Sequence, residues 1–111
     1  MAYIKDYTGR IALSVDRDQI RSYTGAILHR IDGDYVKDFS GRIEYRLSGD
    51  YVYDYTGRIV YRFGGDYVYD YTGRIVYRLN GDNICDYTGR IIYRVDGYIS
   101  GRDLAAVIAV L

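Results

Sequence analysis

The chain has 111 residues, the size of one domain, with 49% hydrophobic residues, 16 tyrosines, 13 glycines and no proline. This composition argues against an intrinsically disordered chain and is typical of a compact β-rich protein. The 15 basic and 15 acidic residues cancel, so no basic field gathers phosphates and no nucleic-acid partner is expected, while the single cysteine excludes an internal disulfide.

The N-terminal residues, Met1 to Asp6, contain no apolar stretch that follows basic residues. No secretory signal is therefore visible, and we expect a cytoplasmic protein. The apolar run at residues 104–111 is far shorter than the ~20 residues that a membrane-spanning helix needs, so no transmembrane segment is expected.

Glycines recur every 16 residues in two series that are offset by half a period. The first series is Gly9, Gly25, Gly41, Gly57, Gly73 and Gly89, and the second is Gly33, Gly49, Gly65, Gly81 and Gly97. A short fixed period indicates one supersecondary unit copied about six times, in which each copy buries surface against its neighbours. The sequence therefore predicts a repeat domain over residues 1–101.

Each copy contains two segments that alternate at period two, such as residues 58–62 and 66–70, and Gly-ended loops connect them. Alternating β-branched and aromatic residues predict strands, and the loops predict hairpins. In the loop after Asp70, we expect three residues, with Gly73 at positive φ in a bulge.

The second type of loop, at residues 79–81, also fits a two-residue type I′ turn. We favour three residues here too, because Arg78 then faces Asp82 and nine opposite-charge cross-strand pairs form along the chain.

This register sorts the side chains onto two faces. One face carries the Arg and Asp rows around an aliphatic line, which consists of Ile4, Ile20, Val36, Val52, Val68 and Ile84. The other face is rich in tyrosine and isoleucine, and we expect it to be the better buried face and the contact face. Its members are Ile43, Tyr45, Tyr51, Tyr53, Ile59, Tyr61, Tyr67, Tyr69, Ile75, Tyr77, Ile91 and Tyr93.

Twelve strands at a spacing of roughly 4.8 Å make a sheet on the order of 50 Å wide, and sheets of this width curl, split or close. We therefore predict an all-β fold, an antiparallel meander of about twelve short strands, curled or superhelical, with a short C-terminal helix. A β-solenoid is the alternative. It is disfavoured because its stacked coils would place Asp54 over Asp70 and Arg58 over Arg74.

No residue pattern predicts catalysis, a cofactor or a metal. His29 is the only histidine and occupies the slot that Tyr45 and its equivalents hold, so we interpret it as a substituted packing position. Cys85 likewise replaces Tyr69 in the repeat and has no second cysteine as a partner. The aspartates are spaced for arginine partners rather than clustered as calcium loops are.

The string from Tyr67 to Ile75, Tyr-Val-Tyr-Asp-Tyr-Thr-Gly-Arg-Ile, stands also at residues 51–59, and looser versions run over residues 35–43 and 83–91. It resembles the motif Y-x-Y-D-x-x-G-R of the YD-repeat family of bacterial toxins and teneurins, here with a shorter period of 16 residues. The resemblance implies a spiral of short β-hairpins that serves as a passive shell or scaffold.

The C-terminal residues depart from the repeat. Ser100, with Asp103 three residues later, predicts a helix N-terminus, and residues 102–111 predict a short apolar helix. Such a helix is not stable alone, so it must fold over the sheet or meet the same element of another chain. Its expected contact residues are Leu104, Val107, Ile108 and Leu111.

From these features we expect a non-enzymatic structural or protein–protein interaction module that self-associates through its Tyr/Ile face. Its expected partners are further copies of the chain or another protein. The alternative is a carbohydrate-binding module, because exposed rows of tyrosine can stack on sugars.

Overall fold

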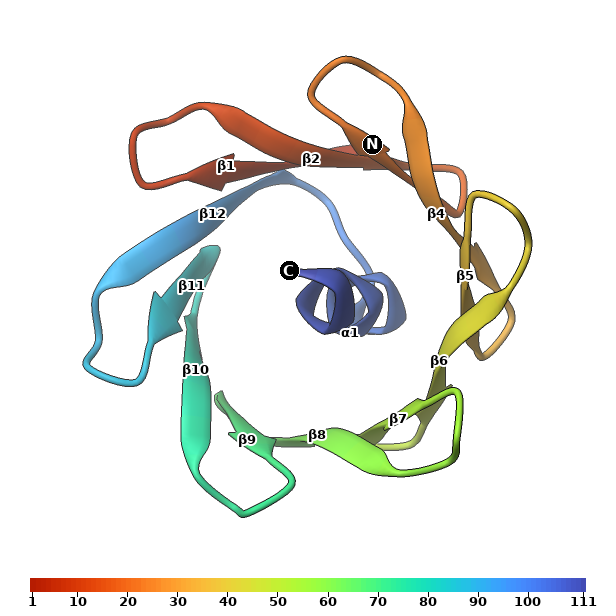
Figure 1. The fold of residues 1–111 in the computed structure, drawn as a ribbon. Helices are drawn as coiled ribbons and strands as arrows, with labels where there is room; N and C mark the ends of the chain where they lie inside the picture. The colour runs from red at the N-terminus through yellow and green to blue at the C-terminus, as the bar shows by residue number, and fades with distance from the viewer.

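The computed structural model describes residues 1–111 and contains twelve antiparallel strands and one helix (Figure 1). Between the two end strands, strands of six residues alternate with strands of four. The elements are β1 Ala2–Asp6, β2 Ile11–Asp16, β3 Gln19–Ser22, β4 Ile27–Asp32, β5 Tyr35–Asp38, β6 Ile43–Ser48, β7 Tyr51–Asp54, β8 Ile59–Gly64, β9 Tyr67–Asp70, β10 Ile75–Asn80, β11 Asn83–Asp86, β12 Ile91–Gly97 and α1 Gly101–Val110.

The sheet is closed, because β1 pairs with β12 and every other strand pairs with its neighbours in sequence. At this seam Ile4 lies opposite Val95, and Lys5 Nζ forms an ion pair with Asp96 at 2.9 Å. The predicted all-β hairpin meander with a C-terminal helix is confirmed, and the solenoid alternative is wrong. Curling proceeds to a closed barrel, which leaves no exposed sheet edge.

Three-residue loops connect each odd strand to the following even strand, as predicted. In the loop after β9, Gly73 N donates to Asp70 O at 3.0 Å, Asp70 N donates to Arg74 O at 2.8 Å, and Gly73 has φ 89°. This is a type I turn followed by a left-handed glycine, the hairpin that the Asp-x-x-Gly pattern favours.

The second type of loop has two residues, so the predicted three-residue loop is wrong. Asn80 pairs with Asn83, and Gly81 has φ 59° at the first central position, where a two-residue hairpin turn of type II′ requires glycine. Arg78 therefore lies opposite Cys85 rather than Asp82, and none of the nine expected Arg–Asp ion pairs forms.

The predicted assignment of the two faces is also wrong. An extra residue at the start of each even strand, such as Val76, forms a bulge that shifts the pairing by one position, so Tyr77 lies opposite Val68. A shift of one residue moves side chains to the other face. The aliphatic line of Val68 and its equivalents is therefore the buried one, with at most 1% of each residue exposed.

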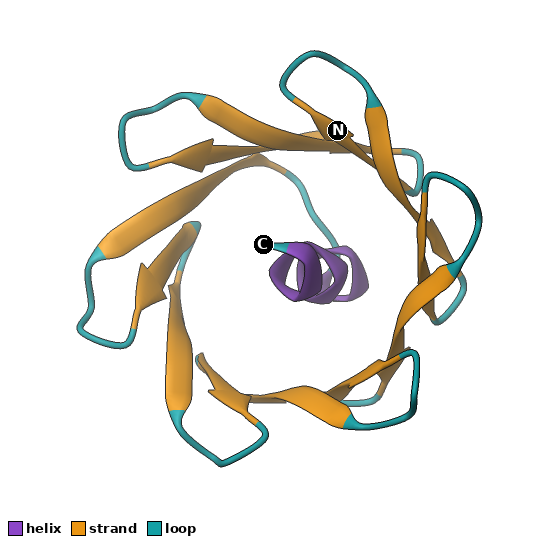
Figure 2. Ribbon diagram, in the orientation of Figure 1, coloured by secondary structure: helices purple, strands orange, loops and turns teal.

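The helix α1 lies inside the barrel (Figures 1 and 2), and its residues Ala106 to Ala109 are buried. Ser100 caps it as predicted, since Asp103 N donates to Ser100 Oγ at 3.1 Å. The helix is therefore covered within the same chain and forms one hydrophobic core with the inward residues of the strands. No helix of the structure has the length and hydrophobicity needed to cross a membrane.

Candidate functional site

One aromatic side chain stands at the tip of each three-residue loop, and these six loops project outward around the ring (Figure 2). These six side chains belong to residues that are 72–80% exposed, the highest values for aromatic residues in the repeat domain apart from Tyr98. We call this set the aromatic crown; it comprises Tyr7, Tyr23, Phe39, Tyr55, Tyr71 and Tyr87.

Hydrogen bonds to one aspartate hold five of the six crown loops in shape, and Ser22 takes the place of the aspartate in the sixth, where Thr24 N donates to Ser22 Oγ at 3.3 Å. Asp70 Oδ1 accepts from Thr72 Oγ1 at 2.6 Å, from Thr72 N at 2.8 Å and from Arg74 N at 3.1 Å. The Thr72 hydroxyl is the largest cause that lowers the pKa of Asp70, and the two backbone donors lower it further. Four other loops repeat this arrangement around Asp6, Asp38, Asp54 and Asp86. The tip aromatic is therefore presented on a fixed loop.

Next to the crown, the first residue of most even strands is an exposed isoleucine. Ile43, Ile59, Ile75 and Ile91 are between 37% and 50% exposed. A groove of about 540 Å³ lies between two neighbouring loops, where Asp38, Arg42 and Ile43 of one face Asp54 and Tyr55 of the next. This groove thus combines apolar, acidic and basic groups at the loop end of the barrel.

The twelve residues of the expected contact face lie on two sides of the wall. Tyr45, Tyr61, Tyr77 and Tyr93 point inward and pack against the core, and burial raises the pKa of Tyr45 and Tyr77. The rings of Tyr61 and Tyr77 lie 6.4 Å apart.

The other eight residues of that face point outward. Among them, Tyr53 and Tyr69 lie under the guanidinium groups of Arg46 and Arg62, at 4.5 Å and 4.4 Å from the ring centroids. Because the residue opposite each of these arginines across the hairpin is a tyrosine, these two hairpins carry cation–π pairs rather than Arg–Asp pairs on the outer wall.

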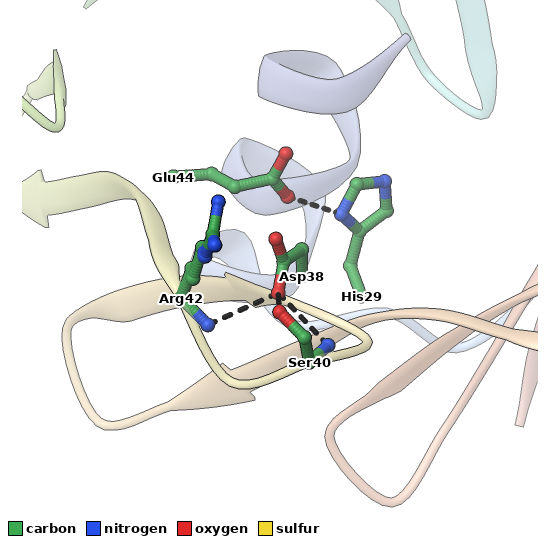
Figure 3. A network of polar contacts seen from close by, with 5 residues as sticks. All are labelled: His29, Asp38, Ser40, Arg42 and Glu44. Atoms are coloured by element: carbon green, nitrogen blue, oxygen red, sulfur yellow. Dashed lines mark hydrogen bonds and ion pairs between the residues drawn. The ribbon is translucent and has the colours of Figure 1, made fainter.

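His29 contacts Glu44, whose carboxylate Oε1 lies 2.5 Å from His29 Nδ1 (Figure 3). These are the only histidine and the only glutamate of the chain, and both replace the repeat residue at their positions. Figure 3 also shows the neighbouring crown loop, in which Ser40 Oγ donates to Asp38 Oδ1 at 2.7 Å. The pair is thus a local exchange of two packing residues for two polar ones.

The tip aromatics were not predicted as contact residues, because the contact face was expected on the strands and these aromatics lie in loops. The signal was present, because the residue after the loop aspartate or serine is aromatic in all six copies. Turn positions favour small polar residues, so an aromatic repeated there needs another explanation. Elsewhere, Cys85 is buried, and no three His, Cys, Asp or Glu side chains gather so as to hold a metal ion.

Comparisons of this chain with protein-family models, with curated proteins and with solved structures find no match.

Proposed function

We propose that this protein is a non-enzymatic interaction module that self-associates through the aromatic crown, two barrels meeting loop end to loop end. The observation that carries the proposal is the exposure of six tip aromatics at equivalent positions on fixed loops. Clustered exposed apolar groups on a soluble protein mark interaction surfaces. Tyrosine also supplies large contact area at interfaces with few rotatable bonds.

The charge pattern of the crown favours a second copy as the partner. Five of the six loops carry one aspartate and one arginine, as in Asp70 and Arg74, so the two charges alternate around the ring. A ring that alternates charge is complementary to itself when a two-fold axis rotates one copy onto another, as the symmetric contact of a dimer requires.

The size of the ring also suits a dimer. The molecule measures 35 by 32 by 17 Å, so a disc of the two larger dimensions has an area on the order of 900 Å². Stable interfaces bury about 800 Å² on each partner.

Sedimentation velocity over a hundredfold range of concentration tests this proposal. We expect a reversible monomer–dimer equilibrium that Tyr55→Ser and Tyr71→Ser weaken, because both remove tip aromatics. Tyr53→Ser is the matched control, since it removes a tyrosine of the outer wall and should leave the equilibrium unchanged. A chain that stays monomeric at every concentration would overturn self-association.

A glycan is the second candidate partner, and one observation favours it. In the groove of about 540 Å³, Tyr55 stands beside Asp54 and faces Arg42 of the preceding loop, so an aromatic ring adjoins charged hydrogen-bonding groups. Sugars stack their apolar face on an aromatic ring while their hydroxyls bind polar groups. If the partner is a glycan, the expected result is a monomer that binds oligosaccharides. Tyr55→Ser should abolish this binding, and Tyr53→Ser should retain it.

A further inference from the structure

The lumen of the barrel is wider than the helix that occupies it. A helix with its side chains is about 10–12 Å across, and barrel diameter grows with strand number, so twelve strands enclose more space than one helix fills. α1 packs against β6 and lies off-centre in the ring (Figure 1).

Burial at one repeated inward position shows which side of the lumen the helix leaves open. Val15, Ile31, Leu47 and Val95 are 3–7% exposed at this position, whereas Phe63 and Leu79 of β8 and β10 are only half-buried. A cavity of about 420 Å³ lies on this open side, at the end of the barrel that carries the two-residue turns. Its size falls in the ~300–1,000 Å³ range of small-molecule sites.

The floor of this lumen cavity is apolar and its mouth is charged. Leu47, Phe63, Leu79 and Leu104 line the floor. At the mouth stand Asp34 and Asp50 of two successive turns, Tyr51 of β7 and Arg102 of α1. An apolar body with one polar head is the shape of ligand that such a lining matches.

The charges at the mouth select the head group. Arg102 already binds the protein, since its guanidinium lies 3.5 Å from Asp18 Oδ1 and 3.8 Å from Asp103 Oδ1 and donates to Gly33 O at 3.2 Å. Asp103 also lies in the first turn of α1, where a carboxylate offsets the positive end of the helix dipole.

Asp34 and Asp50, by contrast, have no cationic partner within the protein. Their backbone carbonyls accept from Leu47 N at 2.6 Å and from Phe63 N at 2.7 Å, so the backbone of each turn is tied to the following long strand.

We propose that the lumen cavity binds a small organic cation, an ammonium group on an apolar aromatic or aliphatic body, with the body against the leucine floor and the ammonium between Asp34 and Asp50. This site is separate from the aromatic crown, which occupies the opposite end of the barrel, and it does not depend on self-association.

Three ligands of one shape and different charge test this proposal: 4-phenylbutylammonium, 4-phenylbutanol and 4-phenylbutanoate, titrated into the full chain by calorimetry. We expect the ammonium to bind at least about tenfold more tightly than the alcohol, because a charge-assisted hydrogen bond contributes that much, and the carboxylate to bind most weakly. The methyl signals of Leu47, Leu79 and Leu104 in NMR spectra should shift with the ammonium.

Asp50→Asn should reduce the affinity for the ammonium toward that of the alcohol, because only Asp34 then remains at the mouth, and should leave the affinity for the alcohol unchanged. Asp82→Asn is the matched control, because Asp82 holds the equivalent place in another turn but does not line the cavity, and it should change neither affinity. Equal binding of the three ligands, absence of binding, or the same response in both variants would overturn the proposal.

Discussion

The first two-residue turn is under backbone strain that the other turns avoid, and relieving it should stabilise the protein. Glycine occupies the first central position of the four later turns, with φ between 59° and 61°. In the first turn Arg17 takes this place with φ 52°, and Asp18 follows with φ 65°. Left-handed backbone costs about 1–2 kcal/mol for a residue with a Cβ atom, so Arg17→Gly removes this cost.

The expected gain is smaller than the strain, because glycine also loses more chain entropy when the protein folds, about 0.4–1 kcal/mol. The net stabilisation should therefore be on the order of 0.5–1 kcal/mol, which raises the melting temperature by roughly 2–6 °C. The turn can then adopt the geometry of its four equivalents, in which the residue after glycine does not have positive φ.

Urea denaturation followed by circular dichroism measures this gain as a higher midpoint at an unchanged m-value. Arg17→Ala is the matched control, since it removes the same side chain but keeps a Cβ atom at positive φ. The arginine forms no side-chain hydrogen bond or ion pair, so only its backbone conformation is at stake. Equal midpoints for the glycine and alanine variants, or a lower midpoint for glycine, would refute the reasoning.

Three further predictions concern acid, the seam and the polar pair. Folding lowers the pKa of Asp70 and its loop equivalents below the ordinary value of 3.8. Their stabilising effect is therefore complete above that pH and is lost as the pH falls through the folded pKa. Denaturation measured between pH 6 and pH 2 should show this loss of stability, and the loss should be smaller in Asp70→Asn. Gly97→Ala should destabilise the protein more than Gly81→Ala in the same assay. Both glycines have positive φ, but only at Gly97 would a Cβ atom lie 2.6 Å from a backbone oxygen, and equal losses of stability would contradict this clash. His29→Tyr and Glu44→Val should each lower stability, whereas the double variant should recover most of the loss, with a coupling of about 0.5–3 kcal/mol; additive losses would show that the two side chains do not interact.

Local features of the fold were predictable because they depend on a few neighbouring residues. The 16-residue period locates every hairpin, Asp70 and Gly73 define their loop, and Ser100 with Asp103 defines the start of α1. In each case the hydrogen bonds that decide the local geometry join residues at most four positions apart.

The assignment of the two faces was not predictable in this way, because it depends on whether the pairing of two strands is shifted by an odd or an even number of residues. The bulge at Val76 shifts the pairing by one residue, and a shift of one residue exchanges the inner and outer faces. Charge patterning favoured a longer turn after Arg78, but the left-handed preference of Gly81 favours the shorter turn that forms. Closure of the barrel is still harder to predict from the sequence, since β1 and β12, which pair, are separated by almost the whole length of the chain.

The place of α1 also explains which copies depart from the repeat. A single helix has no six-fold symmetry, so it cannot contact six identical copies in the same way. The side chain of Arg102 at the N-terminal end of α1 contacts Asp18 and Gly33 of the early copies, and in these copies Leu13 and His29 replace the inward tyrosine of later copies. The later copies beside the lumen cavity keep the string of residues 51–59 again at residues 67–75. Divergence in the copies that Arg102 contacts and repetition in later copies therefore agree with the presence of one asymmetric helix inside a barrel of six similar copies.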